Sequence, residues 1–158
     1  MPIEQDAPAA DEREPVTFDE LYHRTFPSLV RVAYLIIDDA HQAEEVVQEA
    51  FARLWPRFDR VREPEAYVRS SVINESRSVL RRRRLRPRVR MIVVDDEPPD
   101  PLADALRTLS PTRRAVVVCR FYLDLSIEET AKALGMQEGT VKSRLHRALL
   151  DLRGVITR

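Results

Sequence analysis

The chain has 158 residues, of which 44% are hydrophobic and 33% charged, and its 26 basic and 26 acidic side chains give a formal net charge of +0. This length holds one ordinary domain or two small ones. All three glycines, Gly135, Gly139 and Gly154, lie near the C-terminus, which argues against a glycine-rich phosphate loop upstream. The single Cys119 excludes an intrachain disulfide, and the scattered histidines lack metal-ligand spacing, so we expect neither a metal site nor a cofactor.

The neutral total conceals an uneven distribution of charge. Residues 1–20 carry seven acids against one arginine, whereas residues 81–90 carry seven arginines and no acid. Because a local basic patch is what binds nucleic acid, a neutral total does not argue against that function. The N-terminus lacks the cationic and apolar pattern of a signal peptide, and no apolar run approaches the length of a membrane span. We therefore expect a cytoplasmic protein without direct membrane insertion.

The first expected helix follows a short polar tail. Residues 1–16 are rich in proline and acids and poor in large apolar side chains, which is typical of a disordered segment. Thr17 with Glu20 has the pattern of a capping box and predicts that a helix begins there. We expect Pro27 to bend or restart this helix. The apolar residues 29–37 are expected in the core.

Asp39 with Gln42 predicts the start of a second helix, which would run to about residue 58. Its apolar stripe consists of Ala43, Val47, Ala50 and Leu54. Its opposite face carries Glu45, Gln48, Glu49 and Ala52, with Trp55 on the flank. An acidic and amide face beside an exposed tryptophan indicates a binding surface for a basic protein partner. The alternative interpretation is a face that only contacts solvent, with the tryptophan partly buried.

Pro64 fits the first turn of a third helix. Its apolar side carries Val68, Val72 and Val79. A polar stripe on the opposite side runs into a cluster of arginines; the stripe comprises Ser70, Asn74, Arg77, Ser78 and Arg81. Basic side chains at a helix C-terminus interact favourably with the negative end of the helix dipole. This run contains more arginines than that interaction requires. We interpret it as a phosphate-binding patch.

Residues 87–100 have the prolines and acids of a linker. Residues 101–122 predict two further helices, separated at Ser110-Pro111. No strand alternation of useful length and no internal repeat occurs. The sequence therefore predicts an all-α fold with two small helical domains joined by a linker.

The run from Leu125 to Arg147 is the most informative part of the chain. Ser126 with Glu129 predicts another capping box, and Gly135 stands where a helix ends in a left-handed residue. A second helix would begin near residues 138–140. Its expected buried side carries Val141, Leu145, Ala148, Leu149 and Leu152, and its polar side carries Lys142, Ser143, His146 and Arg147. This is typical of a helix-turn-helix whose second helix enters the DNA major groove, and the alternative is an amphipathic helix with a solvated face.

Two motifs, in the order and spacing expected, resemble the extracytoplasmic-function (ECF) sigma factors of bacterial RNA polymerase. The run AEEVVQEAF at residues 43–51 resembles their polymerase-binding helix, and GTVKSRLHRA at residues 139–148 resembles their promoter-reading helix. The resemblance covers residues 17–154. It implies an acidic tail at 1–16, a region 2-like domain at 17–86, the linker at 87–100 and a region 4-like helix-turn-helix domain at 101–154.

The resemblance also implies partners and site residues. Core RNA polymerase would be bound through its β′ clamp helices and β flap, with region 2 contacts from Glu45, Gln48, Glu49, Phe51 and Trp55. Promoter DNA at the −10 element would contact Asn74, Arg77, Ser78, Arg81, Arg83 and Arg84. The −35 element would be read by Lys142, Ser143, His146 and Arg147, with Thr140 and Arg144 placed for phosphates. Family members also capture a flipped base in a region 2 pocket.

The chain departs from the family pattern at two positions and leaves some questions open. Many relatives have asparagine where Ser78 stands, and the position of His146 varies, so the −10 and −35 preferences stay open. Whether an anti-sigma factor binds the chain, as it does many relatives, also stays open.

Three alternative functions would each require features that this sequence lacks. A response-regulator output protein would need a receiver domain of alternating strands and helices, which residues 17–86 lack. An enzyme would need a nucleophile–base set, a metal cluster or a phosphate loop. An RNA-binding module would need stacking aromatics on strands. We therefore expect a non-enzymatic sigma factor.

Overall fold

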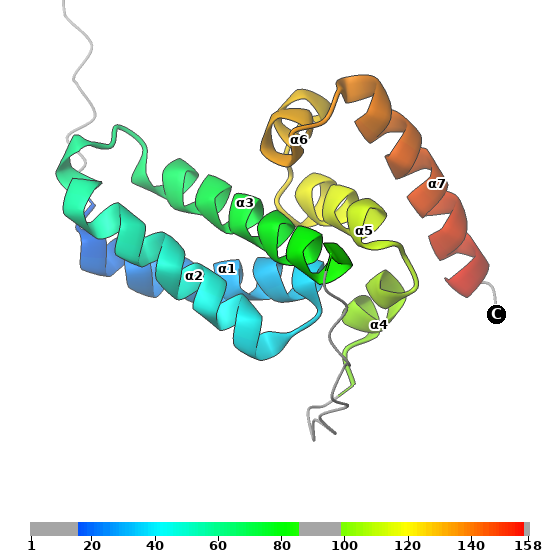
Figure 1. Cartoon of the computed structure of the whole chain (residues 1–158), viewed down its shortest axis with the longest axis horizontal. Helices are drawn as coiled ribbons and strands as arrows, with labels where there is room; N and C mark the ends of the chain where they lie inside the picture. Colours follow the sequence, from blue (N-terminus) through cyan, green and yellow to red (C-terminus); the bar gives the residue numbers. More distant parts are fainter. Residues whose placement is uncertain (1–15, 86–98, 157–158) are drawn as a thin grey trace, which may run out of the picture.

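The computed structural model describes residues 16–85 and 99–156, and its regular elements there are all helical (Figure 1). The first bundle contains α1 (Phe18–Ile37), α2 (Ala40–Leu54), the 3-10 helix η1 (Trp55–Arg60) and α3 (Pro64–Leu85). The second bundle contains α4 (Pro101–Arg107), α5 (Pro111–Val117), the π-helical turn η2 (Val118–Tyr122), α6 (Ile127–Leu134) and α7 (Glu138–Ile156). The predicted all-α class is confirmed. The predicted tail and linker lie outside the described residues, apart from Val16, Pro99 and Asp100.

The capping signals position the first two helices as the sequence predicts. The Thr17 hydroxyl accepts from the backbone of Glu20 at 3.2 Å, and the Glu20 carboxylate accepts from the Thr17 backbone at 2.8 Å. Asp39 caps α2 by accepting from the Gln42 backbone at 3.0 Å. Helix α1 does not restart at Pro27. Buried residues on both sides of the proline lie on one helical face and pack into the same core, which holds the helix continuous.

Two expectations about helix extent and burial are wrong. Helix α2 does not reach residue 58 but changes to the 3-10 helix at Trp55, because Pro56 lacks the N–H that an α-helical bond requires. Leu149 is 40% exposed instead of buried, since α7 packs through Val141 and Ala148 and leaves that flank uncovered. The other predicted stripes, on α2 and on α3, are buried.

The helix-turn-helix forms as predicted. Ser126 and Glu129 make the reciprocal capping box, and Gly135 ends α6 in the left-handed conformation with φ +58°. The backbone N–H of Met136 then donates to the carbonyl of Ala131 at 2.9 Å, which closes the turn. These contacts fix the direction in which α7 leaves the turn.

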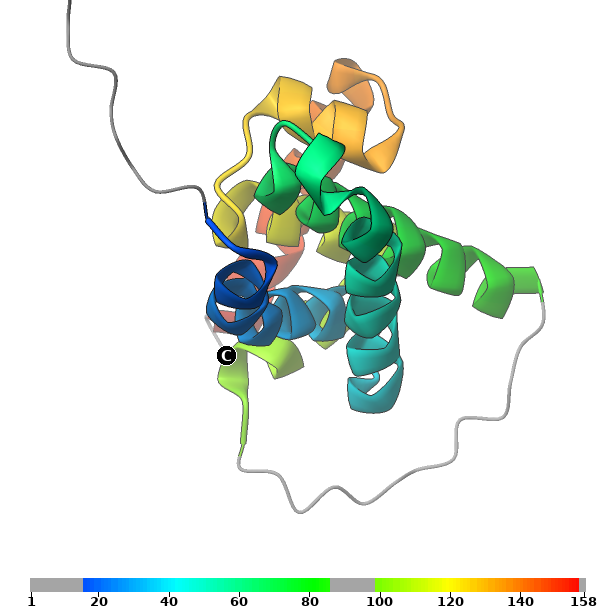
Figure 2. The same cartoon turned by 90° about the vertical axis from the view of Figure 1, so that its left-hand side faces the viewer.

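The two bundles pack directly against each other. Helix α1 lies against α5 and η2, and α3 lies against α6, so that the buried apolar residues of both bundles form one continuous core. Figures 1 and 2 show α7 on the outer side of the second bundle, away from α1 and α3. The two bundles of the described residues thus pack into one unit with a shared core.

The polar contacts between the bundles centre on the carboxyl end of α1. Arg114, with 7% of its surface exposed, donates to the carbonyl of Ile36 at 3.1 Å. Arg107 donates to the Asp38 carboxylate and to the Tyr34 hydroxyl, both at 2.6 Å. Farther along α1, Arg31 pairs with Asp100, the residue that caps α4.

We expect Gly135→Ala to lower the free energy of unfolding by about 1–2 kcal/mol, because a side chain disfavours the left-handed conformation. An alanine Cβ there would also lie 3.1 Å from Nη2 of Arg77. Gly139→Ala is the matched control, since nothing lies within 4 Å of its Cβ. Urea unfolding of both variants checks this, and equal stabilities would contradict the turn assignment.

The second prediction concerns Asp100. The hydrogen bond from Arg31, followed by that from the Ala103 backbone, lowers the pKa of Asp100 from 3.8 to about 2. A depressed pKa in the folded state contributes stability above the unfolded value, and that stability is lost as the pH falls from about 4 towards about 2.

Asp100→Asn keeps a good helix cap but removes the charge. We expect the variant to be less stable than the wild type at neutral pH, and the difference to shrink as the pH falls below about 4. Urea unfolding of both proteins across this range measures it. A difference that does not change with pH would show that the Arg31 pair contributes nothing through charge.

Candidate DNA and polymerase interfaces

The polar face of α7 is available to a partner. Lys142, Ser143, His146 and Arg147 are exposed, while Thr140 and Arg144 are half-buried on the flank. Val141 and Ala148 are fully buried beneath them and fix the rotation of the helix. An exposed helix with two cations and short hydrogen-bond donors has the chemistry to contact base edges and phosphates in a major groove.

The predicted −10 face of α3 is only partly open. Asn74, Arg81 and Arg84 are exposed, whereas Arg77 and Ser78 are half-buried. The guanidinium of Arg77 lies against Gly135 in the turn of the second bundle. It also lies near the Cys119 thiol, whose pKa burial raises to about 12 in spite of this positive charge. No sequence pattern predicts this contact, because it joins residues of different bundles.

Arg83 is occupied within the first bundle. Its Nη1 donates to the carbonyl of Ile37 at 2.6 Å, and its Nη2 donates to Gln42 at 2.6 Å and to Asp39 at 3.1 Å. Among the arginines that end α3, Arg81, Arg82 and Arg84 are exposed, and Arg82 pairs with Glu75 at 3.0 Å. The arginine run therefore contains both a structural residue and exposed cations.

A groove of ≈ 480 Å³ between α2 and α3 brings the predicted polymerase-binding polar residues together. Glu45, Gln48 and Glu49 line one side. Glu75 and Arg82 of α3 line the other and pair at 3.0 Å. The sequence analysis missed these two, although their spacing of seven residues places them on one face of the helix. The groove holds three carboxylates, of which Glu49 pairs with Arg53 at 3.0 Å and Glu75 with Arg82.

The two predicted aromatic contacts differ in their exposure. Trp55 is 65% exposed, and its ring lies edge-on to Phe18 with 4.7 Å between centroids. Phe51 is 2% exposed and packs on Phe18 and Tyr22 at 5.9 and 4.9 Å. Trp55 can meet a partner directly, whereas Phe51 supports the surface from below.

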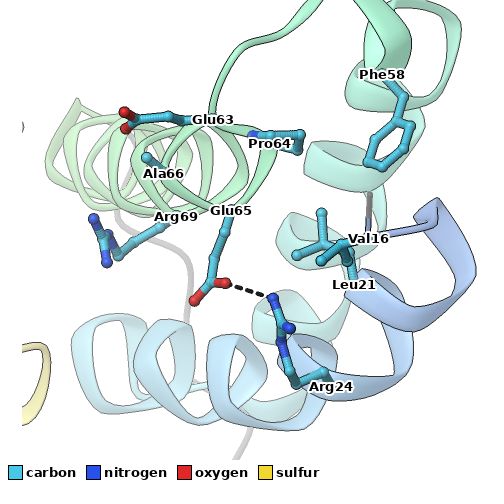
Figure 3. A pocket seen from close by; sticks show the side chains of 9 residues that line it. All are labelled: Val16, Leu21, Arg24, Phe58, Glu63, Pro64, Glu65, Ala66 and Arg69. Carbon is cyan, nitrogen blue, oxygen red and sulfur yellow. Dashed lines mark hydrogen bonds and ion pairs between the residues drawn. The ribbon is translucent and has the colours of Figure 1, made fainter. Parts of the chain in front are cut away.

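A second pocket of ≈ 370 Å³ opens at the amino end of α3. Figure 3 shows Arg24 of α1 and Glu65 of α3 pointing towards each other across it, joined by an ion pair at 2.7 Å. Phe58 and Arg69 lie on its rim among the remaining lining residues, Val16, Leu21, Glu63, Pro64 and Ala66. The pocket combines an aromatic ring with both signs of charge, and sequence analysis did not identify it because three separate stretches of the chain form it.

Within residues 16–85 and 99–156, no group of side chains has the composition of a metal site. In the same ranges, no helix combines the length and the apolar character needed to cross a membrane.

Comparisons with known proteins agree with this geometry. Residues 21–86 match the family model of sigma-70 region 2, and residues 100–152 match that of sigma-70 region 4. The RNA polymerase sigma-E factor of Streptomyces coelicolor is 36% identical, over 89% of this chain and 86% of its own length. The ECF RNA polymerase sigma factor SigL of Mycobacterium tuberculosis is 33% identical, over 84% of this chain and 85% of its own.

The chain belongs to the ECF sigma factors. It is therefore not an enzyme but a subunit that binds core RNA polymerase and directs promoter recognition in transcription initiation.

The fold also has solved counterparts. The sigma factor RpoE of Bartonella quintana, crystallised with the anti-sigma factor NepR, superposes with a TM-score of 0.72 at 24% identity, covering 89% of this chain and 96% of that one. At this identity the likeness concerns the fold alone. We call the first bundle region 2 and the second bundle region 4 below.

Proposed function

We propose that this sigma factor binds core polymerase through the groove between α2 and α3, reads the −35 element with α7, and contacts the −10 element with α3. In this assignment region 2 extends over residues 17–86 and region 4 over 101–154, with 87–100 as the linker, all acting with the cytoplasmic transcription machinery. The observation that carries the polymerase assignment is the groove, which gathers the exposed Glu45, Gln48 and Glu49 beside the half-buried Glu75.

The carboxylates of the groove favour a partner with a basic surface, and we assign the β′ clamp helices as that partner. Trp55, exposed at the end of α2, supplies an aromatic anchor of the kind that dominates binding energy. Phe51 acts indirectly, by holding the aromatic cluster beneath that end of α2. The β flap would be bound by region 4.

Base reading is assigned to Lys142, Ser143, His146 and Arg147, because they are exposed on one face of α7. Thr140 and Arg144 lie on the flank, where phosphates would pass. On α3, we assign Asn74, Arg77 and Ser78 to the −10 strands and Arg81 and Arg84 to phosphates. Arg83 would contribute chiefly by fastening the end of α1, since its donors already bind three acceptors.

An anti-sigma factor is a further expected partner. The Bartonella quintana sigma factor with this fold was crystallised with one. The same acidic groove and exposed apolar side chains that serve polymerase are available to such a protein. Copurification from the source cells would detect it.

We expect Glu45→Arg combined with Gln48→Ala to weaken binding to core RNA polymerase at least tenfold, because a cation replaces an anion in a surface that meets a basic partner. Both side chains are exposed, so the helical circular dichroism should not change. Glu128→Arg, an exposed charge reversal on α6, is the control. Unchanged affinity of the double variant for core enzyme would reject this interface.

A base-reading side chain should act on specificity and a phosphate-binding one on affinity. We expect Arg147→Ala to reduce the preference for the cognate −35 sequence by ~1–3 kcal/mol. Arg84→Ala should weaken binding to all sequences alike and reduce the salt dependence by about one phosphate contact. Competition binding of the polymerase holoenzyme on promoter duplexes that share one −10 element and carry matched or altered −35 sequences, at two salt concentrations, separates the effects. A uniform loss for Arg147→Ala would place it on phosphates.

A further inference from the structure

A row of four charged side chains joins α2 and α3 beside the groove assigned to core polymerase. Glu49 and Arg53, both on α2, pair at 3.0 Å. On α3, the carboxylate of Glu75 lies 3.7 Å from Arg53 and accepts from Arg82 at 3.0 Å. The Glu75 side chain is 22% exposed, the least exposed of the four. Arg82 thus neutralises a carboxylate within the surface that is to meet a basic partner.

Arg82 stands at the border between this groove and the DNA face of α3. At about 100° per residue, it is displaced around the helix by about 20° from Glu75 and by about 40° from Ser78. Glu75 lines the groove, whereas Ser78 belongs to the face assigned to the −10 element. The Arg82 side chain is 65% exposed. A side chain of this length can turn from one surface to the other while the helix stays in place.

The contact of Arg82 is also weak enough to be exchanged. An ion pair as exposed as this one contributes little to stability, because water and salt screen its charges. The neighbouring Arg83 differs, since its side chain is only 35% exposed and binds three acceptors. A guanidinium that leaves a carboxylate can bind a phosphate with the same paired donors. Arg83 is therefore fixed, whereas a competing cation can take the place of Arg82.

We propose that Arg82 is a counterion shared between the two binding surfaces of region 2. It neutralises Glu75 in the free chain, and it turns to a DNA phosphate when a cation of core polymerase takes its place at Glu75. Polymerase binding then adds one phosphate contact beside those of Arg81 and Arg84. The coupling is reciprocal, so a phosphate held by Arg82 leaves Glu75 available to polymerase. The two partners are those of the proposed function, on which this inference rests.

Arg82→Ala tests the proposal because it should affect the two partners in opposite directions. We expect the variant to bind core polymerase about threefold more tightly in the absence of DNA, since no counterion has to leave Glu75. We expect its holoenzyme to bind promoter duplex more weakly, with a salt dependence reduced by about one phosphate contact. Titrations of core polymerase with the full chain, and of the holoenzyme with promoter duplex at several salt concentrations, measure both effects.

Arg84→Ala is the matched control. Arg84 is an exposed arginine of the same helix end and lies outside the residues that line the groove. Its removal should weaken promoter binding in the same way and leave the affinity for core polymerase unchanged. Arg82→Lys keeps the charge and should return both affinities towards those of the wild type. If Arg82→Ala unfolds, Arg82→Gln removes the charge with a side chain that favours helices equally.

The shared counterion is rejected if Arg82→Ala binds core polymerase no more tightly than Arg84→Ala does. It is also rejected if the salt dependence of promoter binding does not change. An arginine that merely ties α3 to α2 would give weaker binding to both partners and a lower free energy of unfolding, which would overturn the proposal too.

A failure of the proposed function has a different signature. In that case Glu45→Arg combined with Gln48→Ala would bind core polymerase as tightly as the wild type does. If the double variant binds core polymerase weakly while Arg82→Ala binds it like the Arg84→Ala control, the polymerase interface stands and only the shared counterion is rejected.

Discussion

The carboxyl end of α1 is the point on which the arrangement of the rest depends. Its last carbonyls have no partners within the helix, and the helix dipole makes this end negative. Arg83 of α3 binds the carbonyl of Ile37, and Arg114 of α5 binds that of Ile36. Arg107 of α4 binds Asp38 where the chain turns into α2. One helix end thus sets the positions of its own bundle and of region 4.

The interface between the two bundles combines polar and apolar contacts. Arg114 is 7% exposed and is held by a carbonyl, so removing its partner while it stays buried would be costly. Around it, the buried apolar residues of both bundles form one continuous core, and separating the bundles would expose that core to water. Both terms therefore favour the docked arrangement.

Sequence alone predicted what depends on short-range chemistry. The capping pairs, Gly135 and the helical stripes act within one or two turns, and the composition of the two motifs indicated the family. It missed what depends on distant residues. Arg83 was interpreted as one of a row of phosphate-binding arginines, and its bonds to Asp39 and Gln42 come from residues more than forty positions away. The pocket around Phe58 and the contact of Arg77 with Gly135 were missed for the same reason.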